Sequence, residues 1–314
     1  MLDTGHIPTG FGTADVQIFY GSQTAEGNDW IAWKKPRGKT MADILLVGKG
    51  ANGGVGVVGA NSTAAGGGGG GSGGQTHLIM PLALLPEVLY LSLVGIVTGS
   101  QLRSFIALSP KLTAGAGIPV ANDTLMMAYG GTVGGNASGA TAGAAGAAGA
   151  IATVGLMPLG WQFATLSLAG QAGIIGGTTV SGANLTLPVT GLLVTGGTGG
   201  GGLPATATNG TLGGSFTVAG QFPAHDAPAA TTVATTRPGN AAGGFMPIPK
   251  LGYWYGGLGS GSTHGSASGG GLFQARGGDG QPGCGGGSMG GALTGSIAAA
   301  VSNGGPAFAI ITCW

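Results

Sequence analysis

Nine residues, GGGGGGSGG at positions 66–74, are the clearest sign of how this chain folds. Further glycine clusters stand at 196–202 and 269–291, and 74 of the 314 residues are glycine, more than three times the usual share of about 7%. Glycine costs about 1 kcal/mol relative to alanine inside a helix, so long helices are disfavoured. Glycine-rich chains instead favour turns and extended threefold polyglycine-II helices, whose backbone groups can bond laterally to one another.

The overall composition indicates an ordered chain despite its glycine content. Glycine and proline at this level are typical of low complexity or disorder. However, only 6% of the residues are charged and 43% are hydrophobic, whereas disordered chains are normally polar and charged. We therefore expect a mainly β and irregular fold, with short β-strands, glycine-rich extended (polyglycine-II-like) segments and very little helix.

The charged residues are unevenly distributed along the chain. The formal net charge is +1, ten of the 19 charged side chains lie in the first 50 residues, and only Asp123 is charged between positions 112 and 225. The balance leaves no basic surface for phosphates, so nucleic acid is not an expected partner. Because a solvated monomer surface normally carries many charges, the uncharged stretch predicts burial against other chains or a surface made polar by backbone amides.

Motifs that depend on glycine carry no weight here, because glycine is frequent enough to match them by chance. Gly38-Lys39-Thr40 looks like the end of a phosphate-binding loop, but Trp33 stands where its first glycine should be. The pattern G-x-S-x-G occurs at 70–74 and 286–290, in both cases inside a glycine cluster. A nucleophile elbow needs a strand before the serine and a helix after it.

Titratable residues form no catalytic or metal-binding set. The four histidines show no metal-ligand spacing, and they are His6, His77, His225 and His264. The pair His225-Asp226 is best read as part of a polar loop, and the only glutamates are Glu26 and Glu87. We therefore expect no enzyme, no cofactor and no metal site.

The cysteines and the apolar segments indicate in which surroundings the chain could fold. Cys284 and Cys313 allow either one disulfide or two buried thiols. The first residues lack the positive and apolar regions of a signal peptide. The most apolar window, 78–98, contains Pro81, Pro86 and Glu87, so it does not predict a transmembrane helix and the protein is not expected to be membrane-embedded.

Several apolar runs predict strands. Residues 16–20, 30–33 and 44–47 read as short strands. The chain ends on the apolar run 308–314, and a terminal strand this apolar should be paired, with 44–47 as its expected partner.

The densest aromatic spot is Tyr253-Trp254-Tyr255, between Gly252 and Gly256. Aromatic side chains on a glycine-rich loop provide a large contact area for binding. They could also pack on a neighbouring glycine layer, which is the more common arrangement, and the sequence leaves both interpretations open.

Three segments resemble the glycine-rich domains of bacteriophage tail fibres, receptor-binding tips and other virion appendage proteins. The first is WKKPRG at 33–38 followed by ILLVGKG at 44–50, where Lys49 and Ala51 interrupt the usual glycine run. The second is the cluster 66–74 followed by PLALLP at 81–86, and the third is the closing strand IITCW at 310–314.

The resemblance implies a multi-chain virion component, with a homotrimer favoured, that is assembled in the host cytoplasm. Residues 1–45 would form a virion-attachment region, and residues 46–314 a glycine-rich domain closed by a C-terminal strand. The predicted attachment residues are Phe19, Tyr20, Trp30 and Trp33. The resemblance further implies a spike or fibre tip that recognises a host cell-surface glycan or an outer-membrane protein, with Tyr253, Trp254 and Tyr255 as receptor-binding residues.

Two other classes remain open at this stage. One is a capsid-associated head fibre, minor capsid or decoration protein without receptor binding. The other is a secreted glycine-rich structural or ice-binding protein, which would show regular Gly-x-x repeats and flat Thr/Ala faces. Only Gly143, Gly146 and Gly149 offer that repeat.

Overall fold

The computed structural model describes most of the chain, and every structural statement below concerns these parts. They are residues 14–22, 30–98, 101–110, 123–152, 165–187, 192–205, 210–217, 256–257, 259–260, 262, 274–296 and 300–314. Of the described residues, 31% are in strands and 2% are helical, and the others are irregular. This confirms the predicted fold class, mainly β with very little helix.

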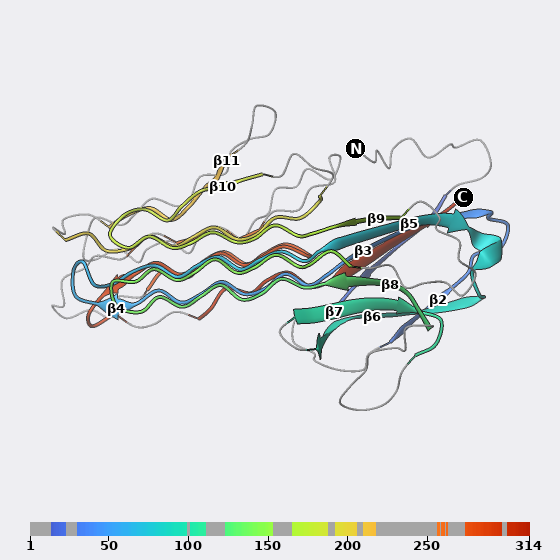
Figure 1. Cartoon of the computed structure of the whole chain (residues 1–314), viewed down its shortest axis with the longest axis horizontal. Coiled ribbons are helices and arrows are strands. Elements are labelled where there is room, and N and C mark those ends of the chain that lie inside the picture. The colour runs from blue at the N-terminus through green and yellow to red at the C-terminus, as the bar shows by residue number, and fades with distance from the viewer. Residues whose placement is uncertain are drawn as a thin grey trace.

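Two antiparallel sheets form a sandwich at one end of the molecule (Figure 1). The strands of the first, in spatial order, are β1 (Asp15–Tyr20), β13 (Phe308–Cys313), β3 (Met41–Val47), β5 (Gln75–Pro81) and β9 (Thr165–Leu168). Those of the second are β2 (Ile31–Lys34), β6 (Val88–Thr98), β7 (Gln101–Ala107) and β8 (Thr124–Tyr129). The 3-10 turn η2 (Leu82–Leu84) connects the two sheets between β5 and β6.

The C-terminal strand lies inside the first sheet. β13 pairs with β3, and Phe308 stands opposite Val47 and Ile311 opposite Ile44. This confirms the expected pairing of the closing run with 44–47. On its other side β13 pairs with β1, so the apolar terminus is bonded along both edges.

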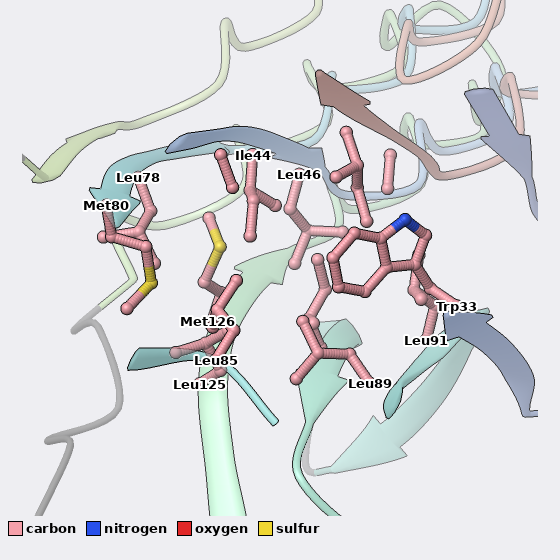
Figure 2. Packing of buried hydrophobic residues seen from close by; sticks show 14 of the residues in the cluster. Trp33, Ile44, Leu46, Leu78, Met80, Leu85, Leu89, Leu91, Leu125 and Met126 are labelled. Atoms are coloured by element: carbon pink, nitrogen blue, oxygen red, sulfur yellow. The ribbon is translucent and has the colours of Figure 1, made fainter. Parts of the chain in front are cut away.

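Side chains from both sheets form one buried core (Figure 2). Successive strand residues point to opposite faces of a sheet, so Ile44 and Leu46 of β3 enter the core together. Trp33 of β2 packs there and is only 1% exposed. Full burial of one such side chain contributes about 1.5–3 kcal/mol, and the cluster is therefore the main hydrophobic stabilisation of this end.

The expected division at residues 45 and 46 does not follow the sheets. β3 runs from Met41 to Val47 across that point. β1 pairs with the C-terminal strand β13, and β2 pairs with β6. The described parts of the first 45 residues therefore form one body with later chain, because their apolar faces are needed to complete the core.

The other described residues form a bundle of extended segments that leave the sandwich and return to it (Figure 1). We call each segment a rod. In the central rod, residues 66–74, all nine amides donate to carbonyls of other rods over 2.7–3.1 Å. Every third amide points to the same neighbour, and the three neighbours are rods 171–177, 283–289 and 129–135. Period three without internal bonds is polyglycine-II geometry.

The carbonyls of the central rod bring in three more rods. They accept amides from rods 48–54, 143–149 and 197–200 over 2.7–3.1 Å. The central rod thus has six neighbours. The neighbours also bond to one another, as in Thr132 N–H to the Ala147 carbonyl at 2.9 Å, and they enclose it completely.

Glycine is required in the central rod because the rods approach so closely. A Cβ atom built on Gly68 would lie 1.9 Å from the carbonyl oxygen of Ala144. The predicted repeat has the same cause, since Gly143, Gly146 and Gly149 each donate to the central rod at 2.9 Å. At about 3.1 Å per residue, nine residues give a bundle about 28 Å long.

Candidate functional site

Five turns between rods meet at the end of the bundle away from the sandwich, near β4 (Val58–Gly59) in Figure 1. We call this the distal face, and its turns are residues 58–64, 138–141, 178–181, 203–205 and 293–296. The Gly202 amide, next to turn 203–205, donates to the Val180 carbonyl of turn 178–181 at 3.0 Å. Three further contacts join the turns. The Ala65 amide donates to the Gly139 carbonyl at 3.2 Å, the Leu203 amide donates to the Ala64 carbonyl at 2.9 Å, and β4 pairs with β12 (Ala292–Leu293).

Local hydrogen bonds hold these turns in defined conformations. Ser138 and Thr141 exchange backbone bonds of 3.0 and 2.9 Å around Gly139, whose φ is +57°. The Thr63 hydroxyl donates to the Ala60 carbonyl at 2.8 Å. Gly295 has φ +94°. Positive φ is accessible to glycine without strain, so glycine shapes the turns as well as the rods.

The chemistry of the distal face is neutral. None of its five turns contains a charged residue. It carries many hydroxyl side chains, namely Ser62, Thr63, Ser138, Thr141, Thr178, Thr179, Ser181, Thr294 and Ser296. Exposed apolar side chains lie among them, with Val180 60% exposed. Such a surface can donate and accept hydrogen bonds and make apolar contacts, and it offers no group that transfers protons near neutral pH.

The predicted receptor-binding residues Tyr253, Trp254 and Tyr255 lie outside the described residues. The chain that follows them is described at Gly256 and Gly257. The Gly256 amide donates to Thr195 Oγ1 at 2.7 Å, and the Gly257 amide donates to the Gly285 carbonyl at 2.9 Å. These contacts belong to the sandwich side of the bundle, so the structure does not bring residues 256–257 to the distal face.

The four predicted attachment residues have different surroundings. Trp33 is in the core, opposite Leu89 of β6, and Phe19 packs against the same core. Trp33 is buried and offers no surface for attachment, so this assignment is corrected. Phe19 is partly buried, and its assignment stays a prediction. Tyr20 is 53% exposed, with its ring 6.4 Å from that of Phe308, and Trp30 is half-buried just before β2.

The serines of both G-x-S-x-G matches are buried inside rods. Ser72 Oγ accepts the Gln171 amide at 2.7 Å, and Ser288 Oγ donates to the Thr198 carbonyl at 3.1 Å. Both hydroxyls therefore form hydrogen bonds with the backbone of a neighbouring rod. Neither lies at a junction between a strand and a helix, which a nucleophile elbow requires.

The two cysteines are free thiols, and both are buried. Cys313 belongs to the core between the sheets, whereas Cys284 lies on the other face of the first sheet with Val47 and Phe308. Burial raises the pKa of Cys284, and burial together with the Asp15 carboxylate raises the pKa of Cys313 to about 11, although Lys39 acts in the opposite direction. Neither thiol is therefore activated as a nucleophile.

Side-chain amides replace missing backbone partners in the bundle, a role that the sequence did not reveal. Asn52 Oδ1 accepts the Gly304 amide at 2.9 Å, and Asn136 Oδ1 accepts the Val55 amide at 2.9 Å. Gln274 Nε2 donates to two rod carbonyls at 2.8 Å. A lone amide residue beside a glycine cluster is the sequence signal that could have found them.

One long side of the bundle is uncharged, and we call it the outer flank. It consists of rods 143–151, 170–177 and 182–187, which bond to one another, for example from the Gly173 amide to the Gly146 carbonyl at 2.9 Å. Ile151 is 63% exposed there and Ile175 is 51% exposed.

Comparison with protein-family models and with curated proteins finds no match to this chain. In the described parts, no cluster of three or more His, Cys, Asp or Glu residues could hold a metal ion. The same parts contain no helix with the length and apolar character that crossing a membrane demands.

Proposed function

We propose that the protein is a structural component of a phage virion, a spike or fibre tip that presents its distal face to the host surface. The observation that carries this proposal is the central rod with its six bonded neighbours. Such a lattice fixes turns from five separate parts of the chain at one end of a bundle about 28 Å long. The ordered resemblance of its opening, middle and closing segments to phage appendage proteins supports the same conclusion.

The lattice suits this role because it resists bending. Each rod is bonded to its neighbours at every third residue, and bending would break several of these buried bonds together. A buried backbone group that loses its partner costs about 1–3 kcal/mol. Exposed turns on such a support can vary in sequence while their positions stay fixed.

A host receptor for this face would be a neutral glycan or a polar loop of an outer-membrane protein. Hydroxyl groups and small apolar side chains match ligands of that kind. Copies of the chain would associate in the particle, with a trimer favoured, and the outer flank is a surface that such association would cover.

Cryo-EM of the intact particle tests the structural role, and adsorption tests the receptor role. Ala140→Arg and Thr294→Arg place a bulky charge on the distal face. Val133→Arg places the same charge on a residue that is 61% exposed and lies outside both the distal face and the outer flank, so it serves as the matched control. We expect the distal variants to lower the adsorption rate constant about tenfold, a change equivalent to 1.4 kcal/mol. Equal adsorption by all three variants would remove the distal face as the receptor site.

The predicted aromatic residues need their own variant. Replacing Tyr253, Trp254 and Tyr255 with alanine should lower adsorption if this loop contacts the receptor. Normal adsorption by that variant would restrict recognition to the distal turns. If neither set changes adsorption while the chain is present in particles, the capsid-associated or decoration protein becomes the better description.

The outer flank favours one competing function, an ice-binding protein. Ala145, Ala148 and Ile151 follow one another at three-residue spacing, as do Ala172 and Ile175 on the next rod. A regular apolar surface without charge is what adsorption to ice requires. Thermal hysteresis of the purified chain at millimolar concentration is the test, and freezing at the equilibrium melting point would exclude this function.

A further inference from the structure

Strand β1 is an open edge of the five-stranded sheet and carries an exposed apolar row. Among the described strands it stands first in the strand order and has one neighbour, β13. Val16 and Ile18 are each 50% exposed and Tyr20 is 53% exposed. Alternate residues of a strand share one face, so these three side chains form a continuous row.

The backbone of the same three residues faces the open edge. The Gly21 amide donates to the Ala307 carbonyl at 2.8 Å, and the register continues from there along β13. In an antiparallel pair, bonded and non-bonded residues alternate. The odd-numbered residues of β1 therefore bond to β13, and the peptide groups of Val16, Ile18 and Tyr20 point outward.

This edge lacks the features that normally prevent pairing with another chain. Exposed edge strands usually carry lysine, proline or a bulge. The sequence of β1, DVQIFY, has neither lysine nor proline, and its register with β13 is unbroken. Its only charge, Asp15, stands at its first position and accepts a bond from Gln17 Nε2 at 3.2 Å.

A basic turn lies at the same end of the sandwich as the start of β1. Residues 34–39 include Lys34, Lys35, Arg37 and Lys39, and the next residue, Thr40, donates its amide to the Trp314 carbonyl beyond the end of β13 at 2.8 Å. The only carboxylate lining the pocket in this turn, about 370 Å³ in volume, is Glu87, which pairs with Lys35 Nζ at 3.0 Å. Even with Lys35 paired, the turn carries more basic than acidic side chains.

We propose that β1 pairs with an extended segment of the virion protein that carries this chain, a segment with apolar residues at alternate positions and acidic residues at the end beside the basic turn. The peptide groups of β1 would bond to this segment, and its apolar side chains would cover Val16, Ile18 and Tyr20. The acidic residues of the partner segment supply the charge complementary to residues 34–39. This inference rests on the proposed function, and it places attachment at the end opposite the distal face.

A second copy of the chain does not fit this edge equally well. β1 runs toward the bundle, because it is parallel to β3 and β3 leads into the rod at residue 48. Antiparallel pairing of two β1 strands would reverse one copy. The two distal faces would then point in opposite directions, and they could not both point away from one particle.

Site-specific charge substitution in the phage tests the inference. Ile18→Lys puts an ammonium group in the middle of the apolar row. Leu166→Lys does the same on β9, the opposite edge of the same sheet, where the side chain is 48% exposed. We expect the first change to lower the number of copies per particle about tenfold or more, because it buries an unpaired charge at the contact. We expect the second to leave that number unchanged.

A photoreactive amino acid at position 18 gives a second measurement that does not depend on the folding of a charged variant. An adduct with another virion protein at a strand-like segment supports the inference. An adduct with a second copy of the chain, no adduct, or normal incorporation of the folded Ile18→Lys chain overturns it while the proposed function stands. Absence of the wild-type chain from particles would overturn both.

Discussion

Replacing Gly71 with alanine tests the lattice at its centre. Gly71 lies in the middle of the central rod, and its amide donates to the Thr132 carbonyl at 3.1 Å. A Cβ atom at this position would stand 1.9 Å from the carbonyl oxygen of Ala147 on a neighbouring rod. Real Cβ contacts are not shorter than about 3.0 Å. Rod 143–149 must therefore move away by about 1.1 Å.

The cost of that movement follows from the bonds that hold this rod. Its amides at Gly143, Gly146 and Gly149 each donate to the central rod at 2.9 Å. A further 1.1 Å lengthens such a bond to about 4.0 Å, which is beyond hydrogen-bond distance. Three lost bonds at about 1 kcal/mol each give about 3 kcal/mol. Alanine also lowers the conformational entropy of the unfolded chain, which stabilises the folded state by about 0.4–1 kcal/mol. The net destabilisation is therefore about 2–3 kcal/mol.

Thermal unfolding followed by calorimetry measures the effect. For a chain of this size we expect a decrease in Tm of about 4–6 °C, at about 2 °C per kcal/mol. Gly59→Ala is the matched control, because its Cβ would meet nothing closer than Thr63 Oγ1 at 3.3 Å. If Gly71→Ala melts within 1 °C of the wild-type protein, rod packing does not require glycine and the reasoning is refuted.

Three further changes probe other parts of the structure. Burial raises the pKa values of Cys284 and Cys313 above the usual 9.0, so the thiols of the unfolded chain lose their protons at lower pH than those of the folded chain. The free energy of unfolding should therefore fall as pH rises from 9 toward 11. Cys313→Ala should weaken that dependence in urea titrations at several pH values. Trp33→Ala should cost about 3–5 kcal/mol in the same assay, whereas Tyr20→Ala should cost less than about 1 kcal/mol. Asn136→Ala should cost about 0.5–1.5 kcal/mol, because it removes one bond to a backbone amide, and a change below 0.3 kcal/mol would show that water replaces it.

The strands of the sandwich could be predicted because their signals are local. A continuous apolar run between glycines, such as 44–47, predicts a buried strand. The apolar run at the C-terminus needs a strand partner of the same kind. The pairing of 308–314 with 44–47 follows from matching such runs, and it is confirmed. The extended form of the glycine clusters was predictable as well, since composition alone disfavours helix.

The arrangement of the rods could not be predicted because their contacts are made by the backbone. Every glycine presents the same backbone N–H donor and C=O acceptor. The amino-acid sequence therefore does not indicate that the cluster 66–74 is central or that 171–177 lies beside it. The distal face depends on that arrangement and was missed for the same reason. The burial of Trp33 was not predicted for another reason. Its strand has only four residues, and such a short alternation of side chains does not show which face of the strand is buried.

The same residue type makes the rods intolerant of change and the turns tolerant of it. Inside the bundle a single methyl group on Gly71 displaces a whole rod. At the turns of Gly38 and Gly139, a Cβ atom would meet nothing within 4 Å, and only the positive φ of each position limits substitution. Asparagine and aspartate reach that conformation at modest cost. Sequence variation in this fold should therefore concentrate in the turns, which is the separation that a surface for variable recognition on a fixed support requires.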